Sequence, residues 1–181
     1  MADHEKQPIL IVFGGLPGTG KTTLAKATAR ELSATYLRID VIEQALRAPS
    51  GLPSEIGTAG YVVAYALAES NLRLGGVVVA DSVNSLAVTR NAWRQVATNA
   101  LSRIVEVEII CSDQVEHKRR VETTRTDDIA GLPLTWKEVI ERDYEAWDQP
   151  HIMIDTANYW VDMALTTLLG QIRSQLDFQG K

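Results

Sequence analysis

The chain is poor in several features, and each shortage excludes a class of protein. Its 181 residues include one cysteine, Cys111, so an intramolecular disulfide and a thiolate metal site are both excluded. Basic residues are fewer than acidic ones, and the net charge of −5 argues against a protein that coats nucleic acid. The apolar run at 9–13 is too short for a secretory signal or a membrane span. We therefore expect a cytoplasmic protein that has no membrane partner.

What is present indicates one globular domain spanning 1–181, with 45% hydrophobic and 23% charged residues. Apolar, strand-like runs alternate with segments of helical periodicity. The predicted strands are 9–13, 35–40, 77–80, 104–111 and 151–155, and the predicted helices are 22–32, 55–74, 86–103, 114–124, 136–147 and 159–176. This alternation predicts an α/β fold, with a doubly wound, parallel five-stranded sheet covered by helices on both faces. Ligands of such sheets bind at the carboxyl ends of the strands.

Residues 15–22 match the P-loop pattern Gly-x4-Gly-Lys-[Ser/Thr] without a mismatch, between a predicted strand and a predicted helix. In such a loop, backbone amides form a nest for phosphate, the lysine reaches the β and γ phosphates, and the threonine hydroxyl ligates Mg²⁺. We therefore predict binding of ATP and Mg²⁺, with Lys21 exposed in the nucleotide-free chain. The predicted nucleotide-binding residues are Gly15, Leu16, Pro17, Gly18, Thr19, Gly20, Lys21, Thr22 and Thr23.

Two aspartates, Asp40 and Asp81, come directly after apolar runs, where the ligand-binding edge of the sheet is expected. We interpret Asp40 as a general base that accepts the proton of an attacking hydroxyl. Asp81, with Thr22, is the predicted magnesium site. Each aspartate could instead cap a helix or a turn, and which of the two is the base stays open.

Arginines supply the remaining candidates. Arg90 falls on the apolar face of the predicted helix 86–103, so we expect it to point toward the cleft, or else to pair with Asp81 or another carboxylate. Arg94 is expected to be solvated. The basic stretch within 114–134 predicts a lid in which Arg120 and Arg125 fold over the nucleotide, the alternative being an exposed, charged helix face.

Two further groups are assigned no site. Trp136, Tyr144 and Trp147 match helical spacing and are expected to belong to the core rather than to a ligand platform. The three histidines, His4, His117 and His151, lack the spacing of metal ligands.

Together these residues resemble the small P-loop kinase group: gluconate kinase, adenylylsulfate kinase, chloramphenicol phosphotransferase, polynucleotide kinase and the zeta toxins. Within it, the chain is most similar to the bacterial AAA-family ATP-binding kinases. The matching segments are 15–22, 38–40, 77–82, 90–93, 119–125, 135–136 and 154–156. The resemblance implies that Asp40 is the catalytic base, that Arg90 contacts the substrate or transition state, and that Arg120 and Arg125 are lid contacts. It also implies that segment 156–158, with Ala157 and Asn158, flanks the adenine.

The leading hypothesis is an ATP-dependent phosphotransferase that acts on a hydroxyl group of a small molecule or nucleotide. Its predicted catalytic residues are Lys21, Asp40, Arg90, Arg120 and Arg125. Residues 41–75, which include Arg47, Tyr61 and Tyr65, are expected to bind the acceptor, which the sequence does not identify. A nucleotide-dependent regulatory ATPase and a polynucleotide 5′-hydroxyl kinase are the alternatives, and the acidic net charge makes a nucleic-acid partner less favoured. The chain is expected to act as a monomer or homodimer.

Overall fold

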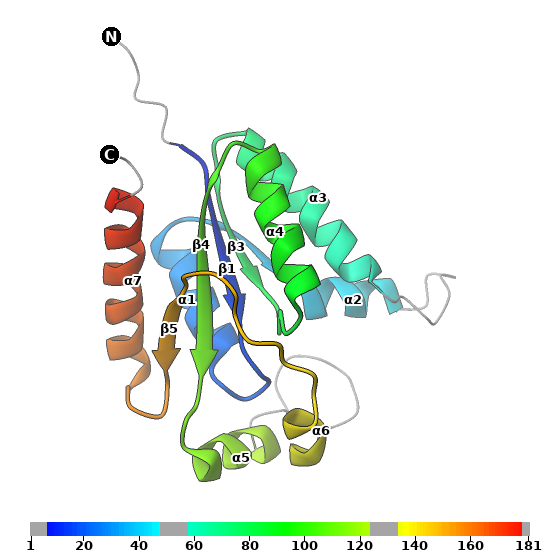
Figure 1. Cartoon of the computed structure of the whole chain (residues 1–181), viewed down its shortest axis with the longest axis vertical. Coiled ribbons are helices and arrows are strands. Elements are labelled where there is room, and N and C mark those ends of the chain that lie inside the picture. The colour runs from blue at the N-terminus through cyan, green and yellow to red at the C-terminus, as the bar shows by residue number, and fades with distance from the viewer. Residues whose placement is uncertain (1–6, 48–57, 124–133, 179–181) are drawn as a thin grey trace.

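The fold is described by a computed structural model, which covers residues 7–47, 58–123 and 134–178 (Figure 1). Its sheet has five parallel strands. The strand order is β2-β3-β1-β4-β5. The strands are β1 (Ile9–Gly14), β2 (Thr35–Arg38), β3 (Val77–Asp81), β4 (Arg103–Ile110) and β5 (Ile152–Asp155). Because β1 pairs on both edges and is covered on both faces, its residues 10–13 are fully buried. The predicted α/β fold is confirmed.

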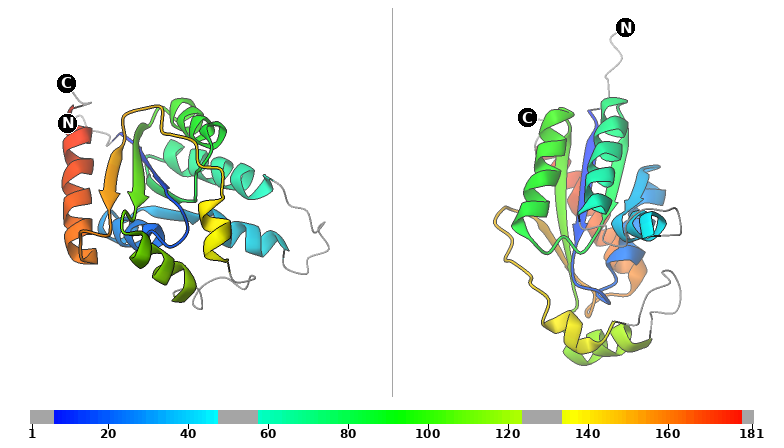
Figure 2. Two further views of the ribbon diagram at one scale, coloured as in Figure 1. Left: turned by 60° about the horizontal axis from the view of Figure 1, so that its bottom comes forward. Right: turned by 90° about the vertical axis from the view of Figure 1, so that its right-hand side faces the viewer.

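Helices cover both faces of the sheet (Figure 2). On one face lie α1 (Lys21–Glu31) and α7 (Val161–Phe178), and on the other lie α3 (Ala59–Arg73) and α4 (Ala87–Asn99). Side chains of β1 alternate between the two resulting cores, as the strand period of two requires. None of the helices among the described residues has the length and apolarity that a membrane span requires.

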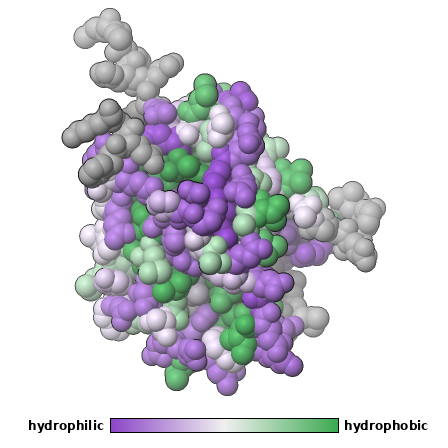
Figure 3. Space-filling view, viewed as in Figure 1, coloured by the Kyte–Doolittle hydropathy of each residue, from purple (hydrophilic) through white to green (hydrophobic). Residues whose placement is uncertain are grey.

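Three shorter helices gather at the carboxyl ends of the strands, at the lower end of the sheet in Figure 1. They are α2 (Ile39–Arg47), α5 (Gln114–Thr123) and α6 (Trp136–Ile140). Thr135 begins α6 with a capping box, because its hydroxyl accepts from the amide of Glu138 while the Glu138 carboxylate accepts from the amide of Thr135. The space-filling view, from the same side as Figure 1, shows hydrophobic residues scattered among hydrophilic ones (Figure 3).

Three sequence predictions of element boundaries are wrong. The predicted helix 86–103 ends at Asn99, and Arg103 begins β4. Residues 39 and 40, predicted to end a strand, form the first turn of α2, because the chain turns into a helix as soon as β2 ends at Arg38. The predicted helix 136–147 ends at Ile140. Residues 141–150 then form an irregular segment, which we call the strap, and several of its side chains bind β4 and α4.

Candidate active site

The loop between β1 and α1 has a backbone that requires glycine. Gly15, Gly18 and Gly20 have φ angles of 140°, 84° and 89°. A Cβ on Gly15 would lie 2.2 Å from the carbonyl oxygen of Ile109, so the loop packs closely against β4. Gly20 precedes α1 and supplies no side-chain cap, which leaves the first amides of this helix to an anionic ligand. The geometry fits the predicted phosphate nest.

A buried ion pair lies beneath this loop. Lys21 Nζ donates to Asp81 Oδ1 at 2.8 Å, and both residues are buried, with 7% and 1% of their surface exposed. The hydroxyl of Tyr36 donates to Asp81 Oδ2 at 2.6 Å. The prediction that Lys21 is exposed is therefore wrong, because its ammonium group reaches the carboxylate at the end of β3.

The electrostatics of this cluster favour an ionised Asp81. Burial by itself would raise the pKa of Asp81, but the charge of Lys21 and hydrogen bonds from Lys21, Tyr36 and Thr22 hold it below its usual value. Burial, with the charge of Asp81, raises the pKa of Tyr36, so its hydroxyl remains a donor.

The side chains of Thr22 and Asp81 thus meet, as the predicted magnesium site requires. Magnesium in kinase sites takes one or two carboxylates together with substrate phosphates, and this pair fits that pattern. Within the described residues, no three His, Cys, Asp or Glu side chains gather as a metal-binding group.

Arg38 links the two predicted carboxylates. Its Nη2 lies 3.5 Å from Asp40 Oδ2, and its Nε lies 4.0 Å from Asp81 Oδ2. The side chain of Asp40, in the first turn of α2, is 43% exposed and so is open to a ligand. Sequence reasoning did not single out Tyr36 or the contact of Arg38 with Asp81. The available signal was the strand period of two, which places residues 36 and 38 on one face of β2.

Helix α5 packs directly on the phosphate loop. His117 Nε2 lies 2.8 Å from the carbonyl oxygen of Pro17, and a Cβ on Gly18 would lie 2.6 Å from Cγ2 of Val121. His117, which the sequence assigned to no site, therefore lies at the phosphate loop. This contact places the first helix of the predicted lid against the predicted nucleotide site.

Arg120 is also tied to the loop. It donates to the hydroxyl of Thr156 at 2.8 Å, and this hydroxyl donates to the carbonyl oxygen of Thr19 at 2.7 Å. Arg120 also donates to the carboxylate of Glu116. Hydrogen bonds from Arg119 and Arg120 lower the pKa of Glu116 to about 2. Arg125 lies outside the described residues, as does segment 124–133 of the predicted lid.

The two residues expected to flank the adenine follow β5. Asp155 accepts from the amide of Ala157 at 3.1 Å and from the side chain of Asn158 at 2.9 Å. Because Thr156 contacts the phosphate loop, this turn lies beside the predicted nucleotide site. Their contact with adenine stays a prediction.

Both expectations for Arg90 are contradicted by the structure. The side chain is fully buried, and its guanidinium donates to the backbone carbonyl groups of Asn84, Ser85 and Ala146 rather than to a carboxylate or into the cleft. Arg94, expected to be solvated, instead forms ion pairs with Glu106 and Asp148.

The predicted acceptor region, residues 41–75, is described in part, since 48–57 lie outside the described residues. Arg47 forms an exposed ion pair with Glu43. The ring of Tyr65 lies edge-on to Trp93 at 4.5 Å, and its hydroxyl donates to the carbonyl group of Thr89, so Tyr65 is part of the core between α3 and α4. Tyr61 lies next to it, at 5.9 Å between ring centroids.

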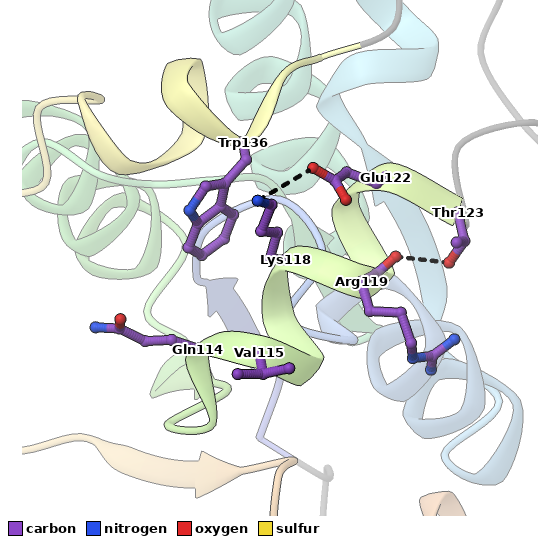
Figure 4. Close-up of a pocket in the computed structure, with 7 residues that line it drawn as sticks. All are labelled: Gln114, Val115, Lys118, Arg119, Glu122, Thr123 and Trp136. Atoms are coloured by element: carbon purple, nitrogen blue, oxygen red, sulfur yellow. Dashed lines mark hydrogen bonds and ion pairs between the residues drawn. The ribbon is translucent and has the colours of Figure 1, made fainter.

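A pocket of about 540 Å³ lies on the outer side of α5 (Figure 4). It is lined by Gln114, Val115, Lys118, Arg119, Glu122, Thr123 and Trp136. The contacts of α5 with the phosphate loop come from His117 and Val121, which do not line this pocket. The pocket is therefore separate from the predicted nucleotide site.

Comparison with known proteins identifies the family. The AAA_33 family model, described as an AAA domain, matches residues 10–132, about two thirds of the chain. The chain belongs to the AAA_33 family. The matched part of this AAA_33 protein contains the phosphate loop, Asp40, Asp81 and Arg120.

Relatives of the AAA_33 protein include kinases. The adenylyl-sulfate kinase of Synechococcus sp. (strain JA-3-3Ab) is 25% identical over 180 residues, which cover 93% of this chain and 96% of that protein. The structure of the Mycobacterium tuberculosis APS kinase in complex with AMPPNP and APS has a TM-score of 0.70 at 20% identity, covering 92% and 98% of the two chains. A gluconokinase from Sinorhizobium meliloti 1021 has a TM-score of 0.66 at 17% identity, covering 97% and 99%.

These findings confirm the predicted resemblance to the small P-loop kinases and the P-loop kinase fold. They support a nucleotide-dependent kinase and leave its acceptor undetermined.

Proposed function

We propose that this AAA_33 protein is an ATP-dependent phosphotransferase that moves the γ-phosphate of ATP to a hydroxyl group of a small molecule or nucleotide. The observation that carries the proposal is the meeting of a phosphate nest, Lys21 and two carboxylates at one edge of the sheet. The similarity to an adenylyl-sulfate kinase over nearly the whole chain supports it. The protein would act in the cytoplasm, as a monomer or homodimer.

The phosphate loop would bind the nucleotide. Its glycine-supported amides and the first turn of α1 would donate to the phosphates, while Lys21 would leave Asp81 and turn toward the β and γ phosphates. Thr22 and Asp81 would hold Mg²⁺, which when bound neutralises charge that develops on the phosphates. Tyr36 would keep the Asp81 carboxylate oriented through its hydrogen bond to Oδ2. Ala157 and Asn158 would flank the adenine.

Asp40 would accept the proton of the acceptor hydroxyl. Its exposure leaves it open to an acceptor bound beside residues 41–75, and Arg38 Nη2 lies 3.5 Å from the carboxylate. Arg120, already tied to Thr156, and Arg125 would bring positive charge to the phosphates as the lid (114–134) closes.

The test is ATP consumption against a panel of alcohols, nucleosides, antibiotics and oligonucleotides, with transfer followed by radiolabelled γ-phosphate. We expect one chemical group of small acceptors to raise consumption and to become labelled. Hydrolysis that no acceptor changes would contradict the proposal and favour a nucleotide-dependent switch. Labelling confined to the 5′ ends of oligonucleotides would favour a polynucleotide kinase.

A further inference from the structure

The strap, residues 141–150, connects α6 to β5 and crosses in front of β4 in Figure 1. It lacks regular backbone pairing, yet three contacts with two other elements, β4 and α4, hold it. Tyr144 donates to Glu108 of β4 at 2.8 Å, and Asp148 accepts from Arg94 of α4 at 2.9 Å. The carboxylate of Glu145 accepts from the amide of Ala87, the first residue of α4. The strap is therefore a segment fixed against β4 and α4.

Arg90 joins the strap to the loop that follows β3. Its Nη2 donates to the carbonyl group of Ala146 in the strap at 2.8 Å, and its Nη1 donates to those of Asn84 and Ser85 at 3.2 Å. Its guanidinium carbon also lies 5.0 Å from the ring centroid of Trp147. A buried guanidinium is costly unless its donors are satisfied. Here two separate segments of chain supply acceptors for Nη1 and Nη2, whereas the buried Nε has no hydrogen-bond partner among the described residues.

Trp147 connects the strap to the strand that leads into the phosphate loop. A Cβ on Gly14 would lie 2.6 Å from Cζ2 of Trp147, so the indole packs against the last residue of β1, one residue before the loop. The indole is oriented by its own hydrogen bond to the Tyr144 hydroxyl, at 3.1 Å. On the β3 side, the amide of Gly15 donates to the carbonyl group of Val83 at 3.0 Å. Gly14, at the end of β1, and Gly15, the first residue of the loop, thus both contact segments that Arg90 ties together.

We propose that Arg90 and Trp147 are positioning residues that hold Gly14 and Gly15, and hence the phosphate nest, in the geometry that binds nucleotide. The inference rests on the proposed function, because it assigns these residues to nucleotide binding although neither would touch the nucleotide. It replaces the expected role of Arg90 as a substrate contact with an indirect one.

The test measures ATP affinity by calorimetry in variants of the full chain. Trp147→Leu and Arg90→Lys should each raise the Kd for ATP roughly 10- to 100-fold, by analogy with the loss that follows mutation of outer-shell partners at metal sites. Trp147→Phe keeps a ring against Gly14 and should stay within about threefold of wild type. Leu72→Ala is the control: it opens a cavity in the core on α3, so it should lower the melting temperature and leave the Kd unchanged.

A second measurement keeps the proposal falsifiable if Trp147→Leu fails to fold. Amide hydrogen exchange over residues 14–22 should be faster in Arg90→Lys than in wild type, and unchanged in Leu72→Ala. Folded Trp147→Leu and Arg90→Lys proteins with wild-type Kd and exchange would overturn the proposal. A wild-type chain that binds no ATP would instead contradict the proposed function, and the exchange data would still decide whether the two residues fix the loop.

Discussion

Asp81 and Asp40 lie at the same edge of the sheet and within 4.0 Å of the same arginine, but their surroundings differ. Asp81 is buried, and Lys21 and Tyr36 hold one carboxylate oxygen each. Asp40 has an exposed side chain at the start of a helix. A carboxylate that is fixed before a ligand arrives should matter for stability and nucleotide binding, whereas an open one should matter for the transfer step. The following predictions test this division.

Among variants that keep ATP binding and the fold intact, the largest effect on transfer is expected from Asp40→Asn. Loss of a general base should lower the transfer rate roughly 10²–10⁴-fold, because the amide cannot accept the proton of the acceptor hydroxyl. ATP affinity and the melting temperature should stay at wild-type values. The measurements are single-turnover transfer and calorimetry, with Glu69→Gln, on the exposed end of α3, as a control. If Asp40→Asn were the variant that needs extra Mg²⁺, the roles of the two aspartates would be exchanged.

Lys21→Ala should abolish turnover and, because the ion pair is buried, also destabilise the fold. Removing one partner of a buried pair costs about 3 kcal/mol, equivalent to a melting-temperature loss of roughly 6–12 °C in a domain of this size. Calorimetric melting and ATP binding check both effects. The Lys21→Ala/Asp81→Ala double variant should lose less than the sum of the two single losses. Unchanged ATP affinity in Lys21→Ala would contradict the assignment of the phosphate loop.

Tyr36→Phe should have a smaller effect. It removes a hydrogen bond to an ionised carboxylate, which contributes about 1.5 kcal/mol to the free energy of unfolding, and it should raise the Mg²⁺ concentration required for activity. Urea denaturation and a Mg²⁺ titration measure the two effects. Tyr65→Phe, which loses a bond to a neutral carbonyl group, provides the comparison and should leave the Mg²⁺ requirement unchanged. Equal Mg²⁺ curves for wild type and Tyr36→Phe would show that Tyr36 does not orient Asp81.

The smallest effect concerns pH. Because the pKa of Asp81 is lower in the folded chain than its ordinary value of 3.8, ionised Asp81 stabilises the fold above about pH 4. This contribution is lost as the pH falls through the lowered pKa. The difference in unfolding free energy between wild type and Asp81→Asn should therefore be constant near neutral pH and shrink below about pH 4. Urea midpoints measured across that range test it, and a gap that widens on acidification would mean that the pKa is raised instead.

Features encoded by consecutive residues could be predicted from the sequence, whereas contacts between distant segments could not. The phosphate loop is encoded within eight consecutive residues, so its pattern and its place between a strand and a helix were sufficient. The sequence also indicated that Arg90 needs partners, because a cation on an apolar face is costly. It could not show that these partners are backbone carbonyl groups of two other segments.

Helical spacing was a misleading signal in the strap. Tyr144 and Trp147 are three residues apart, as on a helix, but they bind Glu108 and pack on Gly14, which lie on neighbouring strands. The link from Tyr36 to Asp81 was also missed, since 45 residues separate the two positions. The strand period shows only that Tyr36 and Arg38 share a face of β2, and the pairing of β2 with β3 then brings that face to Asp81. Tertiary contacts of this kind override local propensity.

The central place of β1 has a consequence for how the chain folds. Its pairing partners begin at Val77 and Arg103, so β1 remains unpaired until these later segments have been synthesised. Every strand pair in the described sheet is parallel, and none can form as a local hairpin. The entropy cost of closing long loops must therefore be met before the strand contacts stabilise the chain. This makes folding slow compared with that of a helical bundle of equal length. During that interval the most apolar strand of the sheet is the segment most exposed to aggregation.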